Sequence, residues 1–369
     1  MSPMTSTAAI RQAPATGVGR ASAADPVVGA APGGVLFDAD DVAAGRWTAD
    51  AVVLERPEQL TLSRLALTPA TEEDVVVDID WSGISTGTER LLWSGRMPPF
   101  PGMGYPLVPG YESVGRVREA GARSGLRAGQ RVFVPGARCF GDVRGLFGGA
   151  ASRVVLQGSR ALPISDALGE RGVLLALAAT AHHAIAVGAS PGAPSSVAPA
   201  PAPPELIVGH GVLGRLLARL CVAMGGQPVV WESNAARREG AVGYRVTDPA
   251  EDTRRDYRRI CDASGDPSVL DALVARLAPG GEIVLAGFYE QPLSFSFAPA
   301  FMREAVIRVA AQWQPQDLAH VRDLAESGQL PLDGLVTHRA PARDAQAAYR
   351  TAFGDPACLK MVLDWSSRR

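Results

Sequence analysis

Hydrophobic and polar residues follow two different periods along this chain, and the clearest pattern covers residues 205–232. A short apolar run at residues 206–208 predicts a buried strand, and the leucines that follow recur three or four positions apart, which predicts an amphipathic helix. After a Gly225-Gly226 break, a second apolar run at residues 229–231 predicts another strand. The segment is therefore expected to fold as strand, helix and strand.

Three glycines join the first strand to the helix in the order Gly209-x-Gly211-x-x-Gly214. In this context the spacing is typical of a dinucleotide-binding Rossmann unit, because the glycines allow, in turn, a tight bend, backbone approach to a pyrophosphate, and packing of helix on strand. Glu232 follows the first glycine by about 20 residues, where a carboxylate can hold a ribose 2′-hydroxyl. We interpret the segment as a Rossmann unit; the alternative is a glycine-rich turn in another α/β domain.

The remaining pattern predicts a compact β-rich domain over residues 50–188 and a parallel sheet over residues 205–329. In the first domain, helical periodicity is confined to residues 168–187. Its short strands are expected at residues 51–54, 74–79 and 131–134. In the second domain, the β-α-β alternation continues with a strand ending near Gly265, a helix at residues 269–277, a break at residues 279–281 and a strand at residues 282–287.

The two ends of the chain and its middle differ from these domains. Residues 1–49 are rich in Ala, Gly, Pro, Ser and Thr without any period, which predicts a disordered extension. Translation from a start codon upstream of the natural one would give a segment of the same composition. Residues 189–204 have the composition of an Ala/Pro linker. Residues 330–369, with a helix expected at residues 345–353 and a strand at residues 360–363, are predicted to return to the first domain.

Composition limits the classes of partner. The 369 residues include 36 Lys and Arg against 38 Asp and Glu, a formal net charge of −2, so no basic excess favours a nucleic acid. Four scattered cysteines have neither disulfide nor metal-binding spacing, and we expect reduced, mostly buried thiols in a cytoplasmic protein. No apolar run approaches the ~20 residues of a membrane span, and no signal peptide is convincing.

Several segments together resemble a known superfamily. The β-rich start, PLVPGYESVGRV (residues 106–117), the Rossmann unit, DASG and RLAPGGEIVLAGF (residues 276–288) are similar to the medium-chain dehydrogenase/reductases. The resemblance covers residues 51–365 and implies an α/β protein with a β-rich, GroES-like catalytic domain beside a Rossmann domain, a doubly wound parallel sheet. It also implies an alcohol dehydrogenase that forms a homodimer.

Two local segments resemble one branch of this superfamily, the enzymes of bacteriochlorophyll biosynthesis. They are SGISTGTERLLWSGRMPPFPGMGYPLVPGYE (residues 82–112) and GARCFGDVRGLFGGAASRVV (residues 136–155). The resemblance implies a tetrapyrrole substrate, a chlorophyllide, whose ring-A 3-(1-hydroxyethyl) group is oxidised to 3-acetyl. An oily pigment is compatible with peripheral contact with a membrane, although no amphipathic helix in the sequence requires it.

The chain departs from the superfamily's zinc-binding pattern at each expected ligand. The turn that usually carries a cysteine, residues 83–89, has none; Tyr111 replaces the usual histidine; and the third position falls near Ala176. Zinc requires thiolate, imidazole or carboxylate donors, and Glu112 alone is not a site. The four-cysteine structural lobe is absent too. We therefore expect no metal.

Without a metal, side-chain hydrogen bonds must stabilise the developing alkoxide, and a base or a water chain must accept the hydroxyl proton. The resemblance aligns Thr88 with the hydroxyl that relays the proton in the zinc enzymes, and turn capping is its alternative role. Tyr111 is expected close to the substrate carbon, either as a donor to the oxygen or as a filler of the volume that the metal left.

Acids and histidines complete the candidate catalytic residues. Glu112 and Glu89 match acids near the family's site; Glu112 is kept as a candidate, although the commonest role of such acids is structural. His182 and His183 follow on the helix that enters the Rossmann domain. Histidine titrates near neutral pH, so His182 is a candidate to accept the proton through water, with packing or capping as the alternative.

For the cofactor, we expect NAD rather than NADP, because Glu232 repels a 2′-phosphate. The resemblance implies further contacts from Leu213 beneath the nicotinamide, Thr180 near its face, Arg237 at the adenosine ribose, and the backbone of Gly287 and Phe288 at the carboxamide. A solvated surface arginine is the alternative for Arg237. Its basic neighbour Arg238 weakens the argument against NADP.

Aromatic residues are the candidates for a planar substrate, because aromatic faces stack on a macrocycle. They are Trp93, Phe100, Tyr105 and Phe147, each with ordinary core packing as its alternative. The proline- and glycine-rich stretch at residues 97–105 predicts a rigid loop that faces the substrate.

Two other functions stay open on the sequence alone. A zinc-free, NADPH-dependent enone or quinone reductase would also need no metal, and Glu232 argues against it. A non-catalytic protein that binds a dinucleotide or a pigment would tolerate loss of the metal ligands.

Overall fold

The computed structural model describes residues 47–187 and 202–366. The predicted extension over residues 1–49 lies outside the described residues except at its end, where the first strand begins at Thr48. The predicted linker over residues 189–204 lies outside them apart from residues 202–204.

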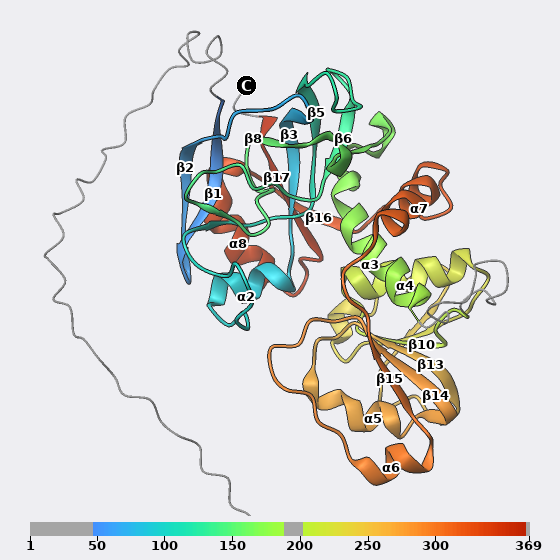
Figure 1. The fold of residues 1–369 in the computed structure, drawn as a ribbon. Helices are drawn as coiled ribbons and strands as arrows, with labels where there is room; N and C mark the ends of the chain where they lie inside the picture. Colours follow the sequence, from blue (N-terminus) through green and yellow to red (C-terminus); the bar gives the residue numbers. More distant parts are fainter. Residues whose placement is uncertain (1–46, 188–201, 367–369) are drawn as a thin grey trace, which may run out of the picture. The chain divides into compact units, whose positions relative to one another are not determined.

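Two sheets form the β-rich part of the structure (Figure 1). The larger contains β3 (Asp74–Ile84), β5 (Ser113–Ala120), β6 (Arg131–Val134), β8 (Arg153–Gln157), β9 (Leu162–Pro163), β16 (Val336–Pro341) and β17 (Lys360–Asp364). The smaller contains β1 (Thr48–Arg56), β2 (Gln59–Ala66), β4 (Leu107–Val108) and β7 (Arg144–Gly145). β3 pairs with β5, β8 and β17, and nearly all of its residues are buried. Its last residue, Ile84, leads directly into the candidate catalytic turn.

Helices accompany these sheets at the positions where the chain turns. They are α2 (Thr88–Ser94), the 3-10 segment η2 (Asp166–Leu174), α3 (Leu175–Ala186) and α8 (Ala345–Gly354). α2 was missed by the sequence analysis, which expected helical structure in this domain only at residues 168–187. It is short, and its sequence is bounded by Gly87 and by Gly95, which adopts a left-handed conformation at the C-cap (φ 70°).

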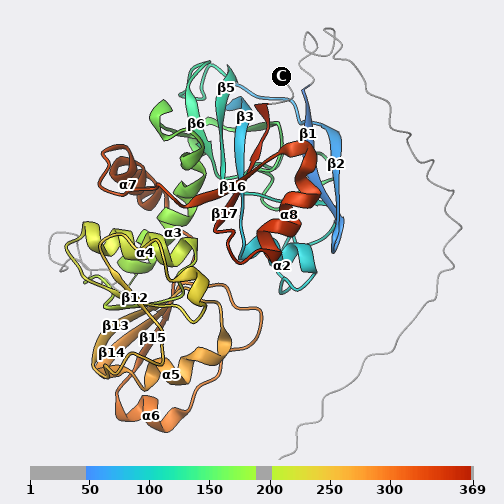
Figure 2. The same cartoon turned by 180° about the vertical axis from the view of Figure 1, so that it is seen from behind.

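A parallel six-stranded sheet forms the second part. Its order is β12-β11-β10-β13-β14-β15, with β10 (Leu206–Val208), β11 (Val229–Trp231), β12 (Arg245–Thr247), β13 (Tyr257–Asp262), β14 (Leu277–Leu285) and β15 (Val306–Val309). The edge strand β12 is labelled in Figure 2. Its helices are α4 (Val212–Ala223), α5 (Leu270–Val274) and α6 (Phe297–Met302), whereas α7 (Pro315–Glu326) packs against α3. The strand order reverses beside β10, which is where an open α/β sheet binds its ligand.

Alternation along the parallel strands divides the hydrophobic core between the two faces of this sheet. Ile207, Val230 and Cys261 pack in the cluster that contains α3 and α4. Their strand neighbours Leu206 and Ile260 pack in a second cluster, together with α5. Both faces are covered, which explains why these strands are apolar throughout. The architecture confirms the predicted α/β class.

The helix and break predicted at residues 269–281 are wrong in their bounds. α5 ends at Val274, and β14 begins at Leu277 and runs through the Pro-Gly-Gly sequence. Leu277 pairs with Tyr257, and the register then shifts before Arg259 pairs with Glu282. Gly280 has a positive φ of 70°, so the predicted break is an irregularity inside one strand.

The C-terminal segment adds β16 and β17 to the larger sheet of the β-rich part. β17 pairs antiparallel with β3, which places Met361 opposite Ile84. All four cysteines are free and buried, as expected. Among the described residues, no helix is both long enough and apolar enough to cross a membrane.

Candidate active site

Hydroxyl groups meet where β3 ends and α2 begins. The Ser85 Oγ and Tyr111 OH atoms lie 2.7 Å apart, and the Thr88 side chain also hydrogen-bonds to Tyr111. Tyr111 reaches this position because it follows Gly110, whose φ is +97° and whose hypothetical Cβ would lie 2.8 Å from the Ala150 nitrogen. The structure therefore brings the predicted Thr88 and Tyr111 together and adds Ser85, which the sequence analysis did not name.

Tyr111 is a hydrogen-bond donor in this environment rather than a base. Burial raises the pKa of Tyr111 well above its ordinary value, and the nearby charge of Glu112 raises it further. The ring packs edge-on against Phe147, with ring centroids 5.4 Å apart. A neutral, oriented phenol suits the stabilisation of a developing oxyanion.

Glu112, the next residue, is held by an ion pair. Its Oε2 accepts a 2.6 Å hydrogen bond from Lys360 Nζ, which also donates to the Ile84 carbonyl oxygen at 3.1 Å. Both side chains are buried, with exposed fractions of 0% for Glu112 and 1% for Lys360. Burial raises the pKa of Glu112, and the Lys360 ammonium opposes that rise. The carboxylate is thereby committed to a lysine that the sequence analysis did not name.

The residues at the family's zinc positions do not fit a zinc ion. All three positions supply a hydroxyl group or no side-chain donor at all, and the carboxylate of Glu112, which follows the second of them, is already paired with Lys360. No group of three or more His, Cys, Asp or Glu side chains in the described part of the chain is arranged to hold a metal.

A second buried carboxyl group, that of Glu89, holds the backbone of the hydroxyl cluster in place. Its Oε1 accepts the Ser85 backbone N–H at 3.1 Å, and its Oε2 accepts the Tyr349 hydroxyl at 2.6 Å. Burial raises the pKa of Glu89 from 4.5 to about 7, and the charge of Glu112 adds to the rise. Glu89 therefore fixes the backbone of Ser85. Because its pKa is about 7, its carboxyl group gains or loses a proton near neutral pH.

Stability is expected to depend on pH through Glu89. Its folded-state pKa of about 7 exceeds the ordinary value of 4.5, so the folded protein binds this proton more tightly than the unfolded chain. The contribution of Glu89 to stability therefore falls as pH rises from about 4.5 to about 7, by on the order of 3 kcal/mol. Glu89→Gln mimics the neutral carboxyl group. In urea unfolding, the free energy of unfolding of the variant should therefore rise relative to that of the wild type as pH increases over this range. A difference that stays flat with pH would contradict the assignment.

The glycine turn has the geometry that a bound pyrophosphate requires. Gly209 has a φ of +94°, and a Cβ on Gly214 would lie 1.8 Å from the Gly209 carbonyl oxygen. A Cβ on Gly211 would meet nothing within 4 Å, so the backbone there is open to a ligand. The chain thus fits the dinucleotide for which its spacing is typical.

Glu232 and the loop after it lie where the adenosine half of the dinucleotide is expected. The carboxylate accepts the His210 backbone N–H at 3.1 Å and the Asn234 backbone N–H at 2.8 Å. Arg237 Nε donates to the Pro356 carbonyl oxygen at 2.9 Å, and Arg238 is ion-paired with Asp248. Both arginines thus interact with other groups of the protein, Arg237 by a hydrogen bond and Arg238 by an ion pair.

The other predicted cofactor contacts lie on or near the same sheet. Thr180 donates its hydroxyl to the Ala176 carbonyl oxygen at 3.0 Å within α3, and Leu213 is half-buried at the start of α4. Phe288 is 51% exposed just after β14, and Gly287 donates its N–H to the Asp262 carbonyl oxygen. Their contacts with a nicotinamide stay a prediction.

His182 belongs to a polar cluster between α3 and α7. Its Nδ1 lies 2.7 Å from Asp317 Oδ1, and His183 Nδ1 lies 2.9 Å from Oδ2 of the same carboxylate. The His182 ring also packs on His320, with centroids 4.6 Å apart. None of these contacts is with Tyr111 or Thr88, so a role of His182 in proton transfer stays a prediction.

The aromatic candidates for the substrate separate into two groups. Trp93 packs against Tyr349, with centroids 6.0 Å apart, and the Tyr105 hydroxyl donates to the Leu92 carbonyl oxygen. These two side chains contribute to the core around α2. Phe100 and Phe147 are exposed at 37% and 36%, and Phe147 lies against Tyr111. Phe147 is therefore the aromatic side chain that the structure links to the hydroxyl cluster.

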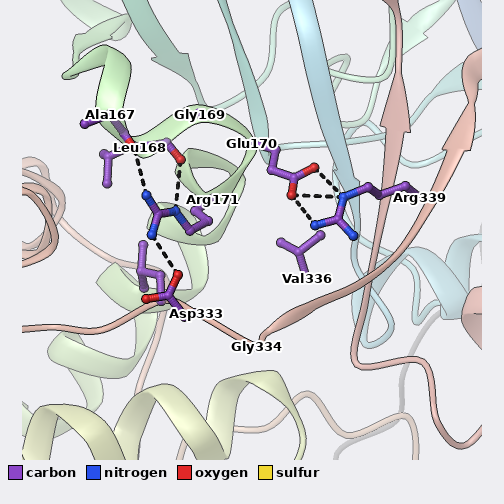
Figure 3. Close-up of a pocket in the computed structure, with 10 residues that line it drawn as sticks. Ala167, Leu168, Gly169, Glu170, Arg171, Asp333, Gly334, Val336 and Arg339 are labelled. Carbon is purple, nitrogen blue, oxygen red and sulfur yellow. Dashed lines mark hydrogen bonds and ion pairs between the residues drawn. The ribbon is translucent and has the colours of Figure 1, made fainter.

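A pocket of about 350 Å³ lies elsewhere, beside η2 and β16 (Figure 3). Arg171 pairs there with Asp333 at 2.7 Å, and Arg339 pairs with Glu170. Both arginines that line it are thus neutralised by carboxylates. None of the candidate catalytic or cofactor residues lines this pocket, and we assign it no function.

Comparisons with known proteins agree with this geometry. Residues 71–166 match the alcohol dehydrogenase GroES-like domain. The chain is 57% identical over 320 residues to the 2-desacetyl-2-hydroxyethyl bacteriochlorophyllide A dehydrogenase of Rhodobacter capsulatus, covering 86% of this chain and 98% of that protein. The protein of the same name from Cereibacter sphaeroides is 57% identical over 321 residues, covering 85% and 98%. A short chain alcohol dehydrogenase from Escherichia coli, solved with NADH, has a similar fold (TM-score 0.70, 21% identity, covering 86% and 99%).

Proposed function

The chain belongs to the family of the 2-desacetyl-2-hydroxyethyl bacteriochlorophyllide A dehydrogenases, within the medium-chain dehydrogenase/reductases, and we propose that it oxidises the ring-A hydroxyethyl group of a bacteriochlorophyllide to acetyl with NAD and without zinc. That it is a dehydrogenase acting on an alcohol follows from its relatives. The observation that carries the zinc-free mechanism is the hydroxyl pair of Ser85 and Tyr111, 2.7 Å apart, beside a carboxylate that is already ion-paired.

In this mechanism the Tyr111 hydroxyl donates a hydrogen bond to the substrate oxygen and keeps its proton. A phenol has a single proton, so Ser85 donates to the Tyr111 oxygen and orients the phenol proton outward. Thr88, which also bonds to Tyr111, passes the hydroxyl proton of the alcohol towards water. When bound, the nicotinamide supplies the acceptor for the hydride that leaves the alcohol carbon.

Buried titratable groups next to this cluster set its electrostatics. Lys360 balances the charge of Glu112, and Glu89 anchors Ser85 through its backbone N–H. Glu112 therefore acts on the site by holding the Lys360 ammonium at the end of β3, where Lys360 also donates to the Ile84 carbonyl oxygen. Phe147, beside Tyr111, offers an apolar face to the planar substrate, with Phe100 as the second exposed aromatic candidate.

Two features support NAD over NADP. The carboxylate of Glu232 lies at the first strand-to-helix turn, where it would bond ribose hydroxyls and repel a phosphate. The guanidinium of Arg238, which would have to help neutralise that phosphate, is already ion-paired with Asp248. Arg237 donates Nε to the Pro356 carbonyl oxygen and keeps its charge, so the second feature rests on Arg238.

A second copy of the chain is the partner that we propose for the outer edge of the parallel sheet. β15 is the last strand of this sheet, and no described strand pairs with its outer side. Val309, at the end of β15, and Phe297, Phe301 and Met302, on the preceding helix α6, are 65–74% exposed. Pairing of this edge in a homodimer would cover an apolar surface that otherwise favours aggregation. A monomer in analytical ultracentrifugation would contradict the proposal.

The test is anaerobic turnover of EDTA-treated protein with the hydroxyethyl bacteriochlorophyllide and either NAD or NADP. We expect conversion to the acetyl product, followed by its absorption spectrum, with NAD preferred and chelation without effect. Activity lost on chelation and restored by zinc would contradict the metal-free mechanism. No conversion with either cofactor would overturn the substrate, and preference for NADP would overturn the role of Glu232.

A further inference from the structure

Arg215, at the beginning of α4, is a buried arginine that no part of the proposed chemistry uses. It is 5% exposed and lies directly after Gly214 of the glycine turn. Its Nε donates to the carbonyl oxygen of His210 inside that turn at 3.0 Å. A buried guanidinium needs partners for all of its donors, and those partners show what it holds in place.

The remaining donors of Arg215 reach the loop that follows Glu232. Nη2 donates to the carbonyl oxygens of Arg237 and Glu239 at 3.1 and 2.7 Å, and Nη1 donates to that of Gly240 at 3.1 Å. We define residues 232–240 as the adenosine loop. One side chain therefore links the glycine turn to the last part of this loop. Its rigid, planar fork can bond to several carbonyl groups at once, which a lysine cannot do.

The residues around this guanidinium are shaped to admit it. Gly240 has a φ of +80°, and a Cβ on it would lie 2.5 Å from Arg215 Nη1, so any side chain there would displace the guanidinium. His210 extends the same link: its Nδ1 lies 2.6 Å from the Arg237 carbonyl oxygen and its Nε2 lies 2.8 Å from the Tyr244 hydroxyl. Burial lowers the pKa of His210 to about 4, so the ring is neutral at pH 7 and donates from Nδ1.

The charge of Arg215 favours the ligand expected here. Its bonds in the structure go to carbonyl oxygens and not to a carboxylate, so its positive charge is not cancelled by an ion pair. It lies in the first turn of α4, where it adds to the positive potential of the helix N-terminus. An anionic dinucleotide above the glycine turn is stabilised by this charge.

We propose that Arg215 is the positioning residue for the adenosine half of the dinucleotide: it locks residues 232–240 to the glycine turn and so presets the place of Glu232. The inference rests on the nicotinamide dinucleotide of the proposed function, but not on which alcohol is oxidised. Because the bonds of Arg215 go to the glycine turn and the adenosine loop and to none of the hydroxyl cluster, its effect is on binding and on selection between NAD and NADP.

The test compares Arg215→Met with Arg219→Met, a matched control on the same helix. Arg219 is also buried, at 4% exposure, and donates to the carbonyl oxygens of Pro331 and Asp333. It also bonds to the Tyr244 side chain, but none of these partners belongs to residues 232–240. We expect Arg215→Met to weaken binding of NAD and of ADP-ribose by about tenfold or more in calorimetry, since several charged hydrogen bonds are lost. The KM for NAD should rise in parallel while kcat stays within about twofold. The preference for NAD over NADP should fall.

ADP-ribose separates the adenosine end from the nicotinamide end without relying on activity. Arg215→Lys, which keeps the charge but loses the planar fork, should bind ADP-ribose with an affinity between those of the wild type and Arg215→Met. This variant decides the matter if Arg215→Met does not fold. Equal ADP-ribose affinity in the wild type and the Arg215 variants, or equal losses in the Arg215 and Arg219 variants, would overturn the inference. If the wild type itself bound neither NAD nor ADP-ribose, the proposed function would fail instead.

Discussion

Tyr111→Phe is expected to lower kcat for oxidation of the hydroxyethyl group by about 10²–10³-fold, because the developing alkoxide loses its hydrogen-bond donor. The substitution keeps the ring and its edge contact with Phe147 and removes only the hydroxyl that bonds to Ser85. It therefore separates the two roles that the sequence left open for this residue. A side chain that merely fills the volume of the metal would leave kcat almost unchanged.

Steady-state turnover and NAD affinity are the measurements for this variant. NAD binding should be unchanged, since Tyr111 lies on the β-rich part and not on the glycine turn. Tyr257→Phe is the matched control, because it also removes a buried phenol hydroxyl, one that donates to Asp252 at 2.7 Å. That control should lose about 1 kcal/mol of stability and little kcat. Equal kcat in Tyr111→Phe and the wild type would remove Tyr111 from the mechanism.

The parts of the site that were predicted from the sequence are those that local sequence determines. The glycine turn, the strands on either side of it and Glu232 lie within one supersecondary unit, so their spacing alone indicates their geometry. The fold class followed from the same rhythm of strands and helices. α2 was missed because seven residues between two glycines give too little periodicity to detect.

The polar support of the hydroxyl cluster could not be predicted because it joins distant positions. Ser85 and Tyr111 are 26 residues apart, Glu89 and Tyr349 are 260 apart, and Lys360 reaches Glu112 across 248 residues. No local pattern specifies such pairs. One signal was nevertheless present: Lys360 is the single lysine among the 36 basic residues of the chain. At that position the structure places an ammonium group against the buried carboxylate of Glu112.

Lys360→Met is expected to lower the free energy of unfolding by about 3–5 kcal/mol, because it leaves the buried carboxylate of Glu112 without its partner. The free carboxyl group would then take up a proton more readily, so the loss should shrink as pH falls below the raised pKa of Glu112. Urea unfolding at several pH values measures both effects. Arg339→Met, which breaks the exposed pair with Glu170, is the matched control and should lose no more than about 1 kcal/mol.

The double variant Lys360→Met with Glu112→Gln distinguishes an unpaired charge from lost packing. If the penalty comes from the charge, neutralising Glu112 should restore most of the stability, whereas a packing defect would persist in both variants. Lys360→Arg should also destabilise, by about 1–3 kcal/mol, since a guanidinium overfills a site with 1% exposure. A compact ammonium that donates to both Glu112 and the Ile84 carbonyl oxygen is what this position requires, and that requirement accounts for the single lysine.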